Sequence, residues 1–181
     1  MSTTTTRATV EDLYKVVGKA EIVNGEIVCM SPTGRMPGRA AGRIYRRLDD
    51  YERTQGGGMA FPDNVGFVVH LPHRDSFSPD AAWYVGPDTG MRFCEGAPLF
   101  AVEVRSEHDY GPAAEREMAA KRADYFACGT LVVWDVDLLS PEVIKSYKAS
   151  DPEHPVIFRR GDVADAEPAV AGWSMSVDEV F

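Results

Sequence analysis

The chain has 181 residues, of which 44% are hydrophobic and 26% are charged, and its formal net charge is -9 at pH 7. This composition is typical of one folded globular domain and excludes a disordered or fibrous chain. The acidic balance argues against a protein that coats nucleic acid or a membrane surface through its overall charge. A polyanionic partner would need a local basic patch or a metal ion.

Three cysteines, Cys29, Cys94 and Cys128, lie too far apart in the chain to indicate a disulfide framework or a zinc knuckle. The N-terminus has no apolar run of signal-peptide length, and no later segment approaches the roughly 18 apolar residues of a membrane span. We therefore expect a cytoplasmic protein without a membrane partner.

The predicted elements begin after a Ser/Thr-rich stretch over residues 1–8, which we expect to be a flexible tail. Thr9 and Asp12 have the spacing of a capping box, which predicts a short helix to about residue 17. Residues 20–30 contain two β-rich runs around Asn24-Gly25, the turn dipeptide that most strongly predicts a hairpin.

A longer helix is predicted from Pro37 to about Arg53, because proline suits a first helical turn. Its apolar residues recur at helical spacing at Ala41, Ile44, Leu48 and Tyr51, while the opposite side carries Arg39, Arg43 and Arg46. Residues 35–53 hold six arginines against three acids. This arginine face is either an ordinary solvated surface or a place for a phosphate backbone.

Strand-like runs follow at residues 65–71, 80–85 and 99–105. The last, LFAVEVR, is largely apolar, which predicts a central strand covered on both faces. A helix over about 112–127 leads into the apolar run TLVVWDVD, so we expect a right-handed strand-helix-strand crossover. Short strands and a docked C-terminal tail complete a single α/β domain over residues 9–181.

Three charged residues stand out within these patterns. Glu103 interrupts an apolar strand, where an ionised carboxylate without a partner is costly. Lys121 belongs to the core-facing stripe of its helix, with Ala114, Met118 and Tyr125. Asp80 opens the preceding strand after Pro79, where neighbouring strands could bring it near Glu103. Two acids and a lysine that converge at strand ends can hold a divalent cation and a water.

The chain resembles the Uma-type family of putative restriction endonucleases, within the PD-(D/E)XK nuclease superfamily. The resemblance covers nearly the whole chain and rests, in the family's order, on IVNGEIVCMSPTG, SPDAAWYV, FAVEVRS, KRADYFACG, VVWDVD and AGWSMSVDEVF. It implies a restriction endonuclease-like fold, in which a mixed central β-sheet is flanked by helices, here with an N-terminal hairpin. It also implies hydrolysis of DNA phosphodiester bonds with Mg²⁺ or Mn²⁺, with Asp80 and Glu103 as metal ligands and with Asp80, Glu103 and Lys121 as catalytic residues.

The chain departs from the family pattern at two points. Many relatives carry a histidine near the start of the first long helix, where this chain has Met36-Pro37-Gly38. Two residues after Glu103, where the superfamily motif has a lysine, this chain has Arg105. Arginine stays protonated, so Arg105 could neutralise Glu103 or hold a phosphate but could not act as a base. Lys121 would orient the attacking water, and it could be the base only if burial lowered its pKa.

Two functions remain open from the sequence. One is a metal-dependent endonuclease that binds DNA weakly through its arginine face, and for which a homodimer would suit the cutting of two strands. The other is a catalytically inactive nuclease-fold module for binding or interaction, in which Glu103 and Lys121 form a structural ion pair. Asp80 could equally be a turn residue after Pro79, and Glu26 is expected at a solvated hairpin position.

Overall fold

The computed structural model describes residues 7–181. The expected flexible tail lies outside the described residues except for Arg7 and Ala8, and the Ala8 amide donates to the Gly25 carbonyl at 2.8 Å. The first helix, α1 (Val10–Leu13), is capped at its N-terminus by Thr9 in the predicted capping box and ends earlier than expected.

The predicted hairpin is formed by β1 (Ala20–Val23) and β2 (Glu26–Cys29), which pair in antiparallel register. Asn24 and Gly25 at its turn have φ angles of 54° and 75°. These left-handed conformations are those of a type I′ turn, which explains why this dipeptide stands here. The remaining elements are α2 (Arg35–Gln55), β3 (Met59–Pro62), β4 (Phe67–Leu71), β5 (Arg74–Phe77), β6 (Ala81–Tyr84), β7 (Cys94–Glu95), β8 (Phe100–Val104), α3 (Pro112–Ala127), β9 (Val132–Val136), β10 (Ile144–Lys148), β11 (Asp151–Phe158), β12 (Val163–Asp165), β13 (Ser174–Ser176) and the 3₁₀ helix η1 (Val177–Val180).

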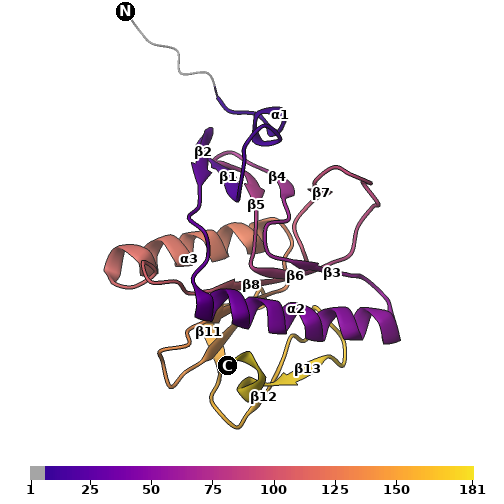
Figure 1. Ribbon diagram of the computed structural model, residues 1–181, viewed down its shortest axis with the longest axis vertical. Helices are drawn as coiled ribbons and strands as arrows, with labels where there is room; N and C mark the ends of the chain where they lie inside the picture. Colours follow the sequence, from indigo (N-terminus) through magenta and orange to yellow (C-terminus); the bar gives the residue numbers. More distant parts are fainter. Residues whose placement is uncertain (1–6) are drawn as a thin grey trace, which may run out of the picture.

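Most strands belong to two sheets. The larger has the order β11-β10-β9-β8-β6-β3 and the other the order β2-β1-β5-β4-β7, while β12 and β13 form a separate pair. Within the larger sheet β8 and β9 are parallel, and α3 connects them as the predicted crossover. The other neighbours in this sheet are antiparallel, so the sheet is mixed, as the predicted fold class requires. In Figure 1 the five-stranded sheet lies above the larger one, near the N-terminal end of the described chain.

Helices cover the two faces of the larger sheet. The apolar stripe of α2 packs with Trp83, Phe100, Val102 and Trp134 and with the C-terminal segment around Trp173. Residues that alternate with these along the strands, such as Ala82, Ala101 and Val133, pack with Tyr125 of α3. Because strand side chains alternate between faces, Glu103 lies on the α3 face with Ala101. No helix formed by residues 7–181 is long and apolar enough to cross a membrane.

Candidate active site

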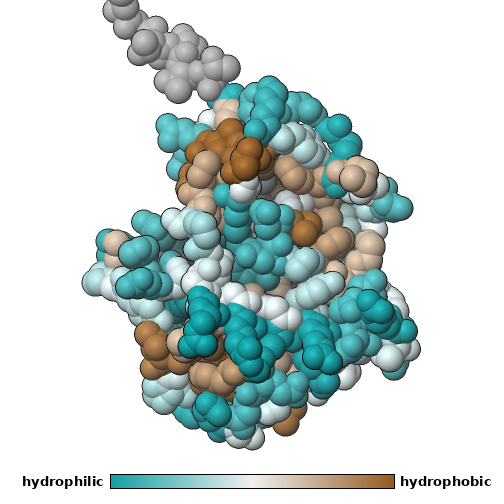
Figure 2. Space-filling model, viewed as in Figure 1, coloured by the Kyte–Doolittle hydropathy of each residue, from teal (hydrophilic) through white to brown (hydrophobic). Residues whose placement is uncertain are grey.

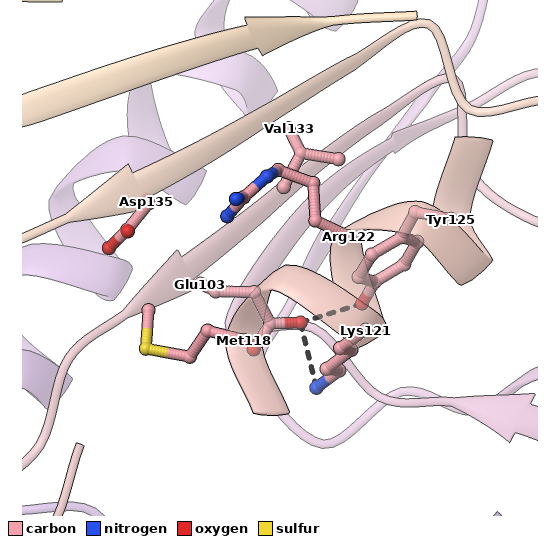
Figure 3. Close-up of a pocket in the computed structure, with 7 residues that line it drawn as sticks. All are labelled: Glu103, Met118, Lys121, Arg122, Tyr125, Val133 and Asp135. Atoms are coloured by element: carbon pink, nitrogen blue, oxygen red, sulfur yellow. Dashed lines mark hydrogen bonds and ion pairs between the residues drawn. The ribbon is translucent and has the colours of Figure 1, made fainter. Parts of the chain in front are cut away.

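Glu103 of β8 and Lys121 of α3 are in direct contact. Lys121 Nζ lies 2.9 Å from Glu103 Oε1, and the Tyr125 hydroxyl donates to the same oxygen at 2.7 Å. Figure 3 shows the carboxylate between these two side chains, which come from successive turns of α3. Tyr125 is itself held by stacking on Phe77 of β5, with ring centroids 4.0 Å apart. Glu103 Oε2 accepts no hydrogen bond from the described residues, and the side chain is 24% exposed.

A small cavity of about 40 Å³ adjoins this contact. A buried water needs about 10–15 Å³ by the same measure, so a few waters fit. Glu103 and Lys121 both belong to the lining of the cavity, so waters there lie beside the two charged residues. The lining residues are Glu103, Met118, Lys121, Arg122, Tyr125, Val133 and Asp135.

Glu21 of β1 is a second carboxylate partner of Lys121, which was not predicted from the sequence. Its Oε1 lies 2.9 Å from Lys121 Nζ and accepts from the Ser78 amide at 2.8 Å, and its side chain is only 4% exposed. Arg74 of β5 donates to Glu21 Oε2 at 2.7 Å and to Asp124 Oδ2 at 2.8 Å. The five-stranded sheet therefore supplies part of the site and holds Lys121 together with Glu103.

Asp80 precedes β6, next to Glu103 in the sheet. Its amide donates to the Val102 carbonyl at 2.9 Å, and its Oδ2 accepts from the Val104 amide at 2.7 Å, one residue beyond Glu103. Its Oδ1 lies 2.6 Å from Lys19 Nζ. The carboxylate is thus anchored across the sheet to β8, which is not the local hydrogen bonding of a turn residue after Pro79.

The ion pairs set the charge states of these groups. Burial opposes the charge on Lys121, but Glu103 and Glu21 outweigh it, so the pKa of Lys121 is raised. Burial raises the pKa of Glu103, and Lys121 acts against that shift. Burial also opposes ionisation of Glu21, yet Lys121 and Arg74 bring its pKa below the ordinary value. Lys121 is therefore a cation at neutral pH and a donor of protons in hydrogen bonds, not a general base.

The donor set suits a divalent cation of the magnesium type. Mg²⁺ prefers oxygen ligands and is commonly held by one or two carboxylates together with waters. The cluster contains five carboxylates, Glu21, Asp63, Asp80, Glu103 and Asp124, which contact three cationic side chains, Lys19, Arg74 and Lys121. The cluster is left with an excess of two negative charges. Among residues 7–181 no group of three or more His, Cys, Asp or Glu side chains is arranged to enclose a metal, so waters would complete the coordination.

Arg105 lies on the same face as Glu103 but binds other acids. Its Nε and Nη2 donate to Asp135 at 2.8 Å and 2.7 Å, and its guanidinium also pairs with Glu115. The Arg105 side chain is only 5% exposed. The expectation that Arg105 neutralises Glu103 is therefore wrong, because Asp135 of the adjacent strand is the nearer carboxylate. The guanidinium of Arg105 is thus occupied by two carboxylates, and its contact with a phosphate stays a prediction.

The arginines of α2 are not at the site. Arg39 and Arg46 are exposed on the side of α2 that faces away from the sheet, and Arg43 donates to the Glu179 carbonyl at 3.2 Å. Because α2 and Glu103 lie on opposite faces of the sheet, these arginines cannot reach the same phosphate as Lys121. Figure 2 shows hydrophilic residues along α2 and a hydrophobic patch over β1 and β2 on the same face of the molecule.

Three residues of the site, Glu21, Lys19 and Asp63, were not predicted from the sequence. Glu21 sits in the short apolar run AEIV, and an acid inside such a run is the same signal that identified Glu103. Lys19 and Asp63 give no local signal, because they flank strands at positions where charged residues are ordinary. Glu26, by contrast, is exposed beside the turn as expected.

Comparisons with known proteins show the family and the fold of the chain. Residues 10–178 match the family Uma2, described as "Putative restriction endonuclease". No protein of curated function matches the chain. One similar solved structure is that of a putative nuclease belonging to DUF820 from Anabaena variabilis, which is 14% identical. The similarity covers 96% of this chain and 97% of that one at a TM-score of 0.73, which shows a shared fold.

Proposed function

Because the chain belongs to the Uma2 family of putative restriction endonucleases, we propose that it is a metal-dependent endonuclease that hydrolyses DNA phosphodiester bonds. The family and the fold support a nuclease-type function. The observation that carries the proposal is that Asp80 lies beside Glu103 on adjacent, paired strands, while Lys121 of the crossover helix contacts Glu103. This is a constellation of hard oxygen ligands beside a fixed cation.

Asp80 and Glu103 would hold Mg²⁺ or Mn²⁺, with Glu103 Oε2 as the carboxylate oxygen that is free of other hydrogen bonds within residues 7–181. When bound, such an ion lowers the pKa of a coordinated water and offsets negative charge on the phosphate. This role requires both carboxylates to be ionised.

The residues around the ion have separable tasks. Lys121 remains protonated, so it donates hydrogen bonds to the attacking water or to a phosphate oxygen and offsets charge that develops there. The Tyr125 hydroxyl and Lys121 together fix the Glu103 carboxylate. The Ser78 amide fixes the Glu21 carboxylate, and Glu21 in turn holds the Lys121 ammonium beside Glu103.

DNA is the proposed substrate, with Arg39 and Arg46 as peripheral contacts to its backbone. A nucleic-acid strand that reaches from the site around the sheet edge would meet α2, so these contacts add affinity without taking part in hydrolysis. Cutting both strands of a duplex requires two sites, which a homodimer would supply. Sedimentation of the purified chain alone and with a DNA duplex tests that assembly.

Plasmid cleavage by pure protein with Mg²⁺ or Mn²⁺ tests the proposed activity. We expect Glu103→Gln and Lys121→Met each to lower the rate by at least about 100-fold, the effect of losing one electrostatic group at a reacting centre. Glu26→Gln, at the exposed hairpin position, is the matched control and should cleave like the unaltered chain. Cleavage that survives both site substitutions would contradict the site assignment.

A second function, a catalytically inactive binding module, has its own observation. Each carboxylate of the cluster already has a lysine or arginine partner, so Glu103 and Lys121 also fit a structural ion pair. If this second function is correct, calorimetry should detect no binding of Mn²⁺ to the pure protein, and the protein should not cleave DNA. Under it, Glu103→Gln and Lys121→Met would change only the free energy of unfolding.

A further inference from the structure

Lys19 lies directly before β1, and its ammonium joins two carboxylates from separate parts of the chain. Nζ is 2.7 Å from Asp63 Oδ1 and 2.6 Å from Asp80 Oδ1. Asp63 comes from the turn after β3, so it belongs to neither strand that carries the acids of the proposed site. Two carboxylate oxygens therefore converge on one point, and a cation already occupies it.

Lys19 is charged at neutral pH. Burial opposes its charge, but the nearby carboxylates of Asp80 and Glu103 outweigh that effect and raise its pKa. The Lys19 side chain is 13% exposed, so bulk water screens these attractions only in part. Lys19 thus supplies one of the three positive charges in a cluster of five acids.

The surroundings of Lys19 differ from those of Lys121. Lys121 is enclosed by Glu21, Glu103 and the ring of Tyr125. On the Lys19 side, the Asp63 side chain is 35% exposed. Its Oδ1 also accepts from the Asn64 amide at 2.7 Å, and its Oδ2 accepts from the Thr33 hydroxyl at 3.5 Å. Lys19 therefore has an acid partner that borders solvent, whereas both carboxylates that contact Lys121 are less exposed than Asp63.

We propose that Lys19 is a built-in counter-cation, which a divalent cation displaces when it binds at Asp80, and that Asp63 then becomes an additional ligand. This inference rests on the proposed metal site and extends it by two residues, one that competes with the ion and one that binds it. The Lys19 ammonium carries one positive charge and the divalent cation carries two. The exchange therefore also offsets part of the excess negative charge of the cluster.

Calorimetric titration with Mn²⁺, without DNA, tests the inference on the whole chain. Lys19→Met removes the competitor, and we expect it to tighten Mn²⁺ binding by about tenfold or more. Asp63→Asn should weaken binding, and Lys19→Arg, which keeps the charge, should not tighten it. Lys15→Met is the matched control, because Lys15 pairs only with the exposed Asp12, and it should leave the affinity unchanged.

Each result bears on the inference. Binding to Lys19→Met that is equal to or weaker than that of the unaltered chain overturns it, even if Glu103→Gln abolishes binding and the proposed metal site stands. Tighter binding to Lys19→Met together with no DNA cleavage by any variant supports the inference and removes the nuclease proposal. If no variant binds Mn²⁺, both fall. A cooperative thermal unfolding transition shows that the Lys19→Met variant is folded. We expect Mn²⁺ to raise the melting temperature of this variant more than that of the unaltered chain.

Discussion

At the scale of single residues, two cations beside Glu103 have different tasks. Arg105 binds Asp135 and Glu115 and is buried, whereas Lys121 lines the cavity and contacts Glu103. The superfamily motif places a lysine at the strand position that Arg105 occupies here. In this chain the lysine that contacts Glu103 comes from the helix, and the strand position anchors β8 to β9 through the Arg105–Asp135 pair.

The pH dependence of cation binding follows from the Glu103–Lys121 contact. Burial raises the pKa of Glu103 above its ordinary value of 4.5, and Lys121 counteracts the shift. Protons compete with a cation for this carboxylate, so binding weakens as the pH falls through the raised pKa. Lys121→Met removes the counteracting charge, and we expect the pH at which half of the Mn²⁺ affinity is lost to move upward. Calorimetry across a pH series measures it.

The control for this shift is Lys148→Met, at a partly exposed position of β10 away from the site. It should leave the pH profile of Mn²⁺ binding unchanged. An equal profile for Lys121→Met and the unaltered chain would mean that Lys121 does not govern the ionisation of Glu103.

At the scale of elements, helix α2 has one apolar face and one positively charged face. Its buried face packs on the larger sheet, and its outward face carries Arg39 and Arg46. We expect the double substitution Arg39→Ala/Arg46→Ala to weaken DNA binding and to reduce the slope of its salt dependence by about 0.9 for each phosphate that is no longer neutralised. Mn²⁺ affinity should stay the same, because α2 lies on the opposite sheet face from Glu103.

Fluorescence anisotropy of a labelled duplex over a series of salt concentrations measures this slope. Arg53→Ala is a suitable control, because Arg53 is already paired with Asp49 at the other end of α2. If the double variant keeps the full slope, the arginine face is an ordinary solvated surface.

The local sequence pattern predicted some helices and strands but not others. The hairpin, α3 and the buried runs of β8 and β9 follow from a turn dipeptide and from hydrophobic periodicity. The strand β5 was not predicted, because its sequence RDSF begins with two charged residues. Arg74 is nevertheless buried, since Glu21 and Asp124 neutralise it, and both partners lie some 50 residues away along the chain. This neutralisation of a buried charge depends on tertiary contacts, so the local sequence around β5 does not indicate it.

At the scale of the whole molecule, the site lies where the two sheets meet. Glu21 belongs to the five-stranded sheet and Glu103 to the larger one, and Lys121 of α3 joins them. From the sequence, a strand acid, a helix lysine and an acid near the start of a strand could be predicted to converge. The contribution of Glu21, Lys19 and Asp63 could not, because it depends on how the second sheet docks.

A cation bound at this junction should stabilise the molecule as a whole. A ligand that binds only the folded state adds about 2.7 kcal/mol at a concentration 100 times its dissociation constant. We therefore expect Mg²⁺ to raise the melting temperature of the unaltered chain and a chelator to reverse the change. Differential scanning calorimetry measures it, and Glu103→Gln should lose the response. A melting temperature that is independent of Mg²⁺ would contradict cation binding.

The joining of the two sheets by Lys121 also bears on synthesis of the chain. Glu21 and Lys121 are separated by roughly a hundred residues, so their contact forms only after α3 has left the ribosome. Domains fold as units during synthesis, and contacts between distant residues form late. A chain that stops before α3 therefore has its acids but lacks the lysine that holds them together. Such a truncated product would be unable to cut DNA, so only the completed fold carries the proposed activity.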